Sequence, residues 1–308
     1  MTVSLNPAVD KTYTTQGLTV GNVNRMRTVM SIAGGKGVNV TKILRQYGYE
    51  VGAVGFLGGY SGRFIEEELE KRGVECRFVH VEGETRSNIN ILADDGYVTE
   101  ILEPGPMVSD EKRDAFFRQY DILLRECGLV VLSGSVALGL NHDIYEKLIL
   151  RAAKESVPVY FDSSGEGLRF GLRAKPQLIK PNWKELEYII GHRLKNREEI
   201  IESAQFLRSM GIDRVIVSMG SKGILSVTRQ GVLHAKPPKI DTVTTVGCGD
   251  SVVASYAMSY VTGETEEQAL VRACAVSAAN ATTVESAEIP LETAEDLMNK
   301  IIVEKVDV

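Results

Sequence analysis

The segment Val246-Gly247-Cys248-Gly249-Asp250 places two glycines close before a carboxylate, at the start of a stretch with helical periodicity. Backbone N–H groups at such a helix N-terminus can stabilise the negative charge that develops on a phosphoryl group during its transfer. A carboxylate beside them can accept the proton of an attacking hydroxyl. The simpler alternative is that Asp250 only caps the helix, a role that aspartate performs well.

A second glycine-rich segment, Gly34-Gly35-Lys36-Gly37-Val38-Asn39, follows an apolar run and opens another amphipathic helix. Glycines there let backbone N–H groups approach a ligand closely, and a helix N-terminus favours an anion. Two familiar motifs are excluded. A Walker loop needs Ser or Thr where Gly37 stands, and a dinucleotide fingerprint needs glycine where Val40 stands. A plain glycine turn into a helix is the alternative interpretation.

Two later segments could contact a nucleotide. Lys180-Pro181-Asn182 ends a strand-like run, and Asn182 with Glu185 has the spacing of a capping box. The same residues place an amide and a carboxylate at the C-terminal end of a strand, where α/β proteins bind ligands. The segment 218–223, Ser-Met-Gly-Ser-Lys-Gly, joins two strand candidates. It is therefore either a hairpin turn or a phosphate-binding loop that also uses Lys222.

The elements that must position these motifs alternate between strands and helices. Short β-branched runs predict strands at 51–57, 129–133, 157–162, 214–218 and 223–228. Amphipathic stretches predict helices at 62–72, 110–125, 142–154, 197–210, 250–261, 266–283 and 291–304. This alternation predicts an α/β fold with a mainly parallel sheet that is covered by helices on both faces.

Two segments, 11–30 and 86–102, break this alternation, because they are long, β-rich and polar at alternate positions. They predict an inserted small β-sheet that projects from the main sheet. A lid over an active site is the functional interpretation, and extra edge strands are the alternative. Since no linker or internal repeat divides the chain, we expect residues 1–308 to form a single domain with a discontinuous β lid.

Composition limits the partners that the protein can have. The 308 residues include 35 Lys and Arg and 41 Asp and Glu, a net charge of −6, and no basic run predicts a nucleic-acid footprint. No apolar stretch of roughly 18 residues could span a membrane, and the N-terminus does not read as a secretory signal. Four cysteines without a Cys-x-x-Cys pair and four histidines without a zinc spacing predict a reduced, cytoplasmic protein without a zinc site.

Taken together, the three motifs resemble those of the ribokinase-like sugar kinases, the PfkB carbohydrate kinase family. The segments 34–39, 180–185 and 247–250 occur in the order and at the spacing of that family, over essentially the whole chain. Further segments resemble the branch that contains 1-phosphofructokinase and tagatose-6-phosphate kinase, namely 5–10, 84–88, Thr99-Glu100 before 104–106, and 162–166. The resemblance implies a ribokinase-like three-layer sandwich.

The resemblance also implies roles for individual residues. Asp250 matches the catalytic base, and Gly247, Cys248 and Gly249 match the anion hole. On the acceptor side it implies contacts from Asp10, Gly34, Gly35, Lys36, Asn39 and Asp250, and contacts from Arg86 and Asn88 toward the acceptor's own phosphate. On the nucleotide side it implies contacts from Lys180, Asn182, Glu185, Ser218, Gly220, Ser221, Lys222, Gly223, Gly249 and Asn280. Mg²⁺ would arrive with ATP and meet Glu185 only through water, and a surface helix position is the alternative for Asn280.

The implied activity is ATP- and Mg²⁺-dependent phosphorylation of a ketohexose phosphate, with fructose 1-phosphate as the first choice and tagatose 6-phosphate as the alternative. A non-catalytic sugar-phosphate sensor is a remote alternative, and a nicotinamide oxidoreductase is disfavoured because its fingerprint is absent. Two positions depart from the family pattern. Cys248 stands where alanine is usual, and 136–138 replaces a proline-rich turn, which leaves the role of Ser135 open. Relatives that dimerise through their lids imply a homodimer.

Overall fold

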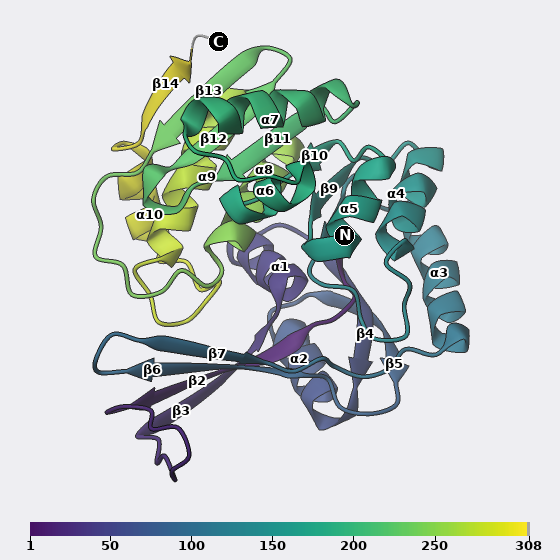
Figure 1. The fold of residues 1–308 in the computed structure, drawn as a ribbon. Helices are drawn as coiled ribbons and strands as arrows, with labels where there is room; N and C mark the ends of the chain where they lie inside the picture. The colour runs from purple at the N-terminus through teal and green to yellow at the C-terminus, as the bar shows by residue number, and fades with distance from the viewer. Residues whose placement is uncertain (307–308) are drawn as a thin grey trace.

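Ten strands form the main sheet of the computed structural model, which describes residues 1–306 (Figure 1). Their order is β14-β13-β12-β11-β10-β9-β8-β1-β4-β5, and the seven from β11 to β5 run parallel. The remaining strands, β12, β13 and β14, pair antiparallel with their neighbours, beginning with β12 on β11. The bounds are β1 Thr2–Ser4, β4 Gly52–Gly58, β5 Glu75–Val81, β8 Val130–Ser133, β9 Val159–Asp162, β10 Leu178–Ile179, β11 Arg214–Ser218, β12 Ile224–Thr228, β13 Gly231–Lys236 and β14 Ile302–Val306. The predicted α/β class with a mainly parallel sheet is confirmed.

Helices cover both faces of this sheet, because successive side chains of its strands point into two separate hydrophobic cores. Val131 and Tyr160 lie in one core, whereas their neighbours Val130 and Phe161 lie in the other. The first core is closed by α1 Lys36–Gln46, α2 Gly59–Lys71, α8 Cys248–Thr262, α9 Glu266–Asn280 and α10 Leu291–Met298. The second is closed by α3 Asp110–Leu124, α4 Ile144–Lys154, α5 Gly165–Arg173, α6 Trp183–Ile190 and α7 Arg197–Ser209. The result is a three-layer sandwich.

The C-terminal ends of the parallel strands lie along the same side of the main sheet, which we call its carboxyl edge. α/β proteins bind ligands at this edge. β8 ends at Ser133, β9 ends at Asp162, and Lys180 directly follows β10. Helix α1 begins at the same edge and packs unusually close to it. A Cβ added to Gly37 would lie 2.8 Å from Cβ of Ser4 and 3.1 Å from the carbonyl oxygen of Ser133. The start of α1 therefore lies so close to the sheet that position 37 must be glycine.

Four further strands form a separate sheet, which we call the small sheet, and it projects from the main body (Figure 1). It consists of β2 Ala8–Thr15, β3 Thr28–Gly34, β6 Ser87–Ala93 and β7 Val98–Leu102. The pairs β2–β3 and β6–β7 are antiparallel, while β2 and β6 run parallel to each other. The small sheet draws on the two segments that broke the strand–helix alternation, but its strands begin earlier, at Ala8, and end later, at Gly34.

The C-terminal segment differs from the helix that we predicted over 291–304. Helix α10 ends at Met298, and β14 pairs antiparallel with β13. Ile302, Val303 and Val306 are β-branched, and the edge of β13 offers them backbone hydrogen-bond partners, so pairing overrides the weak helical pattern. Helix α9 likewise ends at Asn280 rather than at Thr283.

Within residues 1–306, no helix is both long enough and apolar enough to cross a membrane.

Candidate active site

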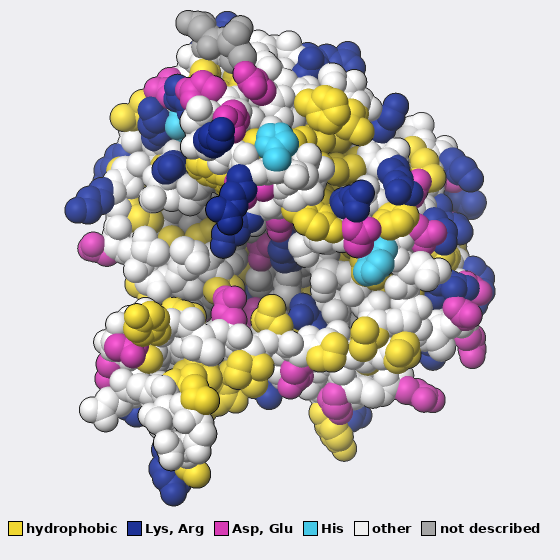
Figure 2. Space-filling view, in the orientation of Figure 1, with side chains coloured by type: hydrophobic (Ala, Val, Ile, Leu, Met, Phe, Trp, Pro, Cys, Tyr) yellow, Lys and Arg dark blue, Asp and Glu magenta, His cyan; other side chains and the backbone are white. Residues whose placement is uncertain are grey.

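The carboxyl edge of the main sheet meets the small sheet at a hollow in the molecular surface (Figure 2). In this view, acidic and basic side chains gather inside the hollow, between the small sheet at the lower left and the main body. Hydrogen bonds and ion pairs connect side chains from α1, α8, β9 and the residue after β10. These are the elements that carry the motifs of the sequence.

Asp250 lies in the first turn of α8 and is only 5% exposed. The amide of Asn39, in α1, donates a hydrogen bond to Asp250 Oδ2 at 2.8 Å. Burial raises the pKa of Asp250 to about 6, and the charge of Asp162 adds to the rise, while Lys36, Asn39 and Lys180 oppose it. Helix α8 has no side-chain cap. The carboxylate is therefore bound to α1 rather than to its own helix, and its pKa suits a proton acceptor near neutral pH.

Two lysines share one oxygen of Asp162, the last residue of β9. Lys36 Nζ donates a hydrogen bond to Asp162 Oδ1 at 3.1 Å, and Lys180 Nζ lies 3.5 Å from the same oxygen. Lys36 Nζ is also 3.6 Å from Glu185 Oε1. Burial disfavours the charge of Lys36, but Asp162, Glu185 and Asp250 outweigh it and raise the pKa of this lysine above its ordinary value. Lys36 therefore stays protonated beside the buried carboxylates.

The start of α8 presents free backbone donors. Among residues 1–306, the N–H groups of Gly247, Gly249 and Asp250 have no hydrogen-bond partner. The N–H of Cys248 differs, because it donates to the carbonyl oxygen three residues earlier at 3.3 Å. Nζ of Lys180 would lie 3.1 Å from a Cβ added to Gly249, so an ammonium group stands against this turn. Free N–H groups beside a cation suit an anion.

A second buried carboxylate, Asp10, lies in β2 at the base of the small sheet. Asn88 Nδ2, in β6, donates to Asp10 Oδ1 at 2.8 Å. Burial raises the pKa of Asp10, although the hydrogen bonds from Asn88 and from the backbone of Gly35 partly offset this rise. A residue larger than glycine at position 34 would displace the Asp10 carboxylate, because a Cβ there would lie 2.0 Å from Asp10 Oδ2. Asp10, Asn88 and the pair Gly34 and Gly35, which lie in three separate segments of the sequence, thus meet at one place.

Arg86 directly precedes β6, and its charge interacts with the buried carboxylate of Asp10. Its Nε donates to the carbonyl oxygen of Asn6 at 3.2 Å, and its Nη1 donates to that of Glu103 at 3.4 Å. Asn6 Nδ2 in turn lies 3.3 Å from Ser135 Oγ. Arg86 and Ser135, whose role the sequence left open, are therefore both hydrogen-bonded to Asn6.

Five buried polar atoms of these elements have no hydrogen-bond partner among the described residues. They are Oδ1 of Asn6, Asn39 and Asn88, Oδ2 of Asp162 and Oγ of Ser133. Buried polar atoms are almost always paired, and each unpaired one costs about 1–3 kcal/mol. Their concentration at the carboxyl edge indicates a site for a polar ligand whose hydroxyl or phosphate groups would supply the partners.

On the predicted nucleotide side, Asn182 and Glu185 form the capping box of α6. Glu185 Oε2 accepts from the Asn182 N–H at 2.9 Å, while Oε1 faces Lys36. The structural and the functional interpretation of this motif are therefore compatible. Residues 219–223 form a turn between the antiparallel strands β11 and β12, with Lys222 Nζ 5.0 Å from the ring centre of Trp183. That turn includes Gly220, Ser221 and Gly223 and follows Ser218, and its contact with a nucleotide stays a prediction.

Asn280 requires a correction. We predicted that it contacts the nucleotide, with a surface position as the alternative, but the side chain is fully buried. Its Nδ2 donates to the carbonyl oxygen of Val246 at 2.7 Å, and its Oδ1 accepts from the Ala287 N–H at 2.8 Å. Both ends of the amide are bound inside the protein, so Asn280 does not face a ligand.

Sequence reasoning missed Asp162, Ser133 and Asn6 as individual site residues. Each is a polar residue at or just after the C-terminal end of a buried strand, and this pattern could have identified them. Within residues 1–306, no group of three or more His, Cys, Asp or Glu side chains could hold a metal ion.

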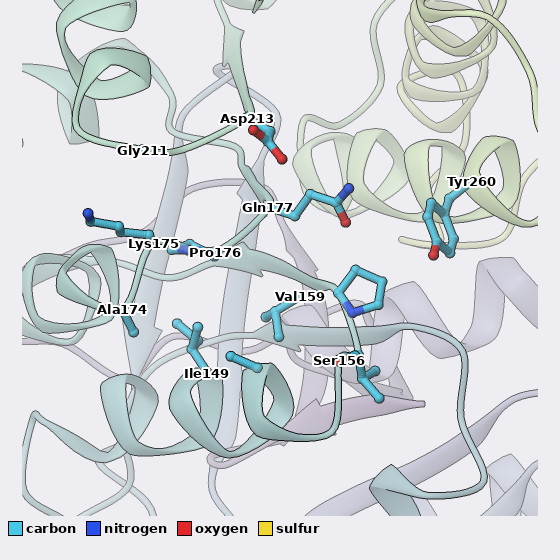
Figure 3. A pocket seen from close by; sticks show the side chains of 13 residues that line it. Ile149, Ser156, Val159, Ala174, Lys175, Pro176, Gln177, Gly211, Asp213 and Tyr260 are labelled. Carbon is cyan, nitrogen blue, oxygen red and sulfur yellow. The ribbon is translucent and has the colours of Figure 1, made fainter.

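A cavity of about 390 Å³ lies away from this site (Figure 3). It is formed by the loops that precede β9, β10 and β11, with Gln177, Asp213 and Tyr260 among its lining residues. These loops are at the opposite edge of the sheet from Asp162. The cavity contains none of the residues that the motifs predicted.

Comparison with known proteins shows the family of the chain. Residues 3–294 match the pfkB family of carbohydrate kinases. The chain belongs to the pfkB family of carbohydrate kinases. A protein of Thermotoga maritima described as a possible 1-phosphofructokinase is similar at 30% identity, with a TM-score of 0.91 and 99% of each chain covered. Phosphofructokinase-2 of Escherichia coli in complex with potassium is similar at 25% identity, with a TM-score of 0.89 and 97% of each chain covered. Its tetrameric inhibited form gives 26% identity, a TM-score of 0.87 and the same coverage.

If Asp250 is the base that the resemblance implies, kcat of this sugar kinase should fall about tenfold per pH unit below about pH 6, because protonation would remove its proton-accepting form. Above that pH the carboxylate is charged and kcat should level off. The measurement is kcat at saturating substrates from about pH 5 to pH 8.

The variant Asp162→Asn distinguishes this titration from that of a substrate phosphate, whose second pKa is also about 6. The charge of Asp162 raises the pKa of Asp250, so its removal should move the acidic limb to lower pH. A limb that stays at the wild-type position in Asp162→Asn contradicts the assignment to Asp250.

Proposed function

We propose that this pfkB kinase transfers the γ-phosphoryl group of ATP to a hydroxyl of a ketohexose phosphate, with fructose 1-phosphate as acceptor and fructose 1,6-bisphosphate as product. The observation that carries the proposal is the buried carboxylate of Asp250, which stands beside free N–H groups and near two ammonium groups. A hydroxyl acceptor needs a base, and a phosphoryl group in transfer needs donors and cations.

In the proposed reaction, Asp250 accepts the proton of the acceptor hydroxyl as that oxygen attacks the γ-phosphorus. A new P–O bond forms to the acceptor, and the bond between the γ-phosphorus and its bridging oxygen breaks, so that ADP leaves with the electron pair. The N–H groups of Gly247 and Gly249 and the ammonium of Lys180 stabilise the charge on the transferring group. Asn39 orients Asp250 through its 2.8 Å hydrogen bond.

The residues present also fit an ATP-bound Mg²⁺ ion. Asp162 Oδ2 is buried without a partner, and the carboxylate of Glu185 lies across Lys36 from Asp162. Such oxygens match the preference of Mg²⁺, which usually keeps several waters in proteins. Glu185 would hold the ion through water, and the ion would supply positive charge to the phosphates of ATP.

Recognition of a sugar that already carries a phosphate rests on Arg86. The guanidinium of Arg86 interacts electrostatically with Asp10 and is distant in sequence from the nucleotide motifs, so it is suited to a fixed dianion on the acceptor. Thr245-Val246 before the hole and 251–254 after it resemble 1-phosphofructokinase, whereas 279–281 resembles tagatose-6-phosphate kinase. The Thermotoga maritima neighbour supports the first. Tagatose 6-phosphate is therefore the second candidate acceptor.

We expect Asp250→Asn to retain substrate binding but to lower kcat by roughly 10²- to 10⁴-fold, the range for losing a general base. The amide keeps the size of the side chain but cannot take the proton. Steady-state kinetics with isothermal titration of the sugar phosphate would measure both effects. A variant with more than about a tenth of the wild-type kcat would show that Asp250 is not the base.

We expect Arg86→Ala to raise KM for the sugar phosphate by roughly 10- to 150-fold, the loss of about 1.5–3 kcal/mol for one charge-assisted contact. KM for ATP should change by less than about twofold, and Arg86→Lys should recover only part of the loss, because a point charge cannot reproduce a two-pronged contact. Arg118→Ala, which removes an exposed arginine of α3, serves as the control. If KM for ATP rises instead, the two ends of the cleft are reversed.

We also propose that a second copy of the chain covers the small sheet. Val29, Val98, Ile101 and Leu102 are large apolar side chains of its edge strands, and all four are exposed. Exposed apolar edge strands are an aggregation liability unless another surface covers them.

Light scattering at micromolar concentration should therefore give about twice the chain mass of 33.7 kDa. Leu102→Glu should shift the protein toward the monomer, whereas Ile122→Glu should not, although both side chains are 62% exposed. Wild-type protein that is monomeric and fully active would contradict the proposed dimer.

A further inference from the structure

The turn before α8 is held from behind by Asn280, the last residue of α9. This side chain is fully buried between the turn at Val246 and the loop that contains Ala287. Its amide makes three hydrogen bonds, of which the one from Nδ2 to Cys248 Sγ is the longest, at 3.5 Å. Nδ2 donates to the carbonyl oxygen of Val246 at 2.7 Å, and Oδ1 accepts from the Ala287 N–H at 2.8 Å.

The loop behind Asn280 is itself fixed at several points. Lys42 Nζ donates to the carbonyl oxygen of Ser286 at 3.0 Å, and the amide of Gln46 makes two hydrogen bonds to the backbone of Ile289, at 2.7 and 2.9 Å. Ala287 has a φ of 61°, a conformation that costs a non-glycine residue free energy and persists only where its surroundings impose it. Asn280 therefore rests on a loop that several hydrogen bonds hold to α1.

The hydrogen bond to Val246 determines which way the next N–H points. A trans peptide is planar, and its C=O and N–H groups point in opposite directions. With the Val246 carbonyl directed at the buried Asn280 amide, the N–H of Gly247 must point away from that amide. That N–H is one of the free donors at the start of α8.

Gly247 fits closely against the same amide. It has a φ of 81°, and a Cβ added to it would lie 3.1 Å from Asn280 Oδ1 and 3.2 Å from the Ala287 nitrogen. Glycine at this position thus serves both the left-handed turn and the close approach of Asn280.

We propose that Asn280 is a positioning residue for phosphoryl transfer, because it sets the orientation of the Val246–Gly247 peptide and so aims the Gly247 N–H at the transferring group. The identity of the transferring group rests on the proposed function, whereas the orientation of the peptide does not depend on it. Asn280 acts through the turn and does not touch ATP. Its effect is therefore on kcat and not on nucleotide binding.

The test compares Asn280→Asp with Gln46→Glu, measured at about pH 8 so that a carboxylate is charged. Both variants replace an amide donor by a carboxylate in a side chain that binds the same loop, but only Asn280 bonds to Val246. Asn280→Asp should lower kcat by about 10²-fold or more, the effect of losing an oxyanion-hole donor, and should change KM for ATP and for the sugar phosphate by less than about threefold. Gln46→Glu should retain kcat within about threefold.

A second readout keeps the test independent of activity and of folding losses. Amide hydrogen exchange at residues 244, 246 and 248, whose N–H groups are hydrogen-bonded, should be faster in Asn280→Asp, and in Asn280→Ala if the first variant folds poorly, but not in Gln46→Glu. If the wild type phosphorylates no sugar phosphate while the exchange result holds, the proposed function fails and the positioning role of Asn280 stands. Unchanged exchange at residues 244, 246 and 248, a rise in KM for ATP with kcat retained, or an equal loss of kcat in Gln46→Glu would overturn the inference.

Discussion

The constraint on which the rest of the structure depends is that a carboxylate, Asp250, must be buried and yet lose its proton near neutral pH. Burying a charge is costly unless it is paired and hydrogen-bonded. Here Asn39 supplies a hydrogen bond, and Lys36 and Lys180 supply positive charge. These four side chains come from α1, α8 and the end of β10, so the fold must hold three elements in fixed relation for Asp250 to act as the proposed base.

That requirement explains why several elements converge at the C-terminal ends of the parallel strands. The lysines are themselves held by Asp162, and α1 lies against β1 and β8 through Gly37. From the other side of the hollow, the small sheet contributes Asp10 and Asn88. Several buried side-chain oxygens of this region have no hydrogen-bond partner in the protein. This is expected of a site whose polar groups bind a ligand rather than one another.

The α/β class, the parallel sheet and the small sheet could be predicted from the sequence, because strand periodicity and strand–helix alternation are local signals. The convergence of Asp250, Lys36 and Asn39 was predicted from motif resemblance and glycine spacing. What sequence reasoning could not give was the direction of individual side chains. Asn280 lies on the predicted helix α9 but turns its amide inward. The strand β14 was also missed, because the edge of β13 that stabilises it is distant in sequence.

The central claim is that the buried base serves a hydroxyl of a sugar that already carries a phosphate. The most direct measurement is ADP release with fructose 1-phosphate, tagatose 6-phosphate, fructose 6-phosphate and ribose as acceptors, each compared with a reaction that lacks a sugar. The account predicts the highest kcat/KM with fructose 1-phosphate, and with ribose a value lower by about 10-fold or more, because ribose lacks the anion that Arg86 would bind. Equal efficiency with ribose, or ADP release that no sugar phosphate increases, would contradict it.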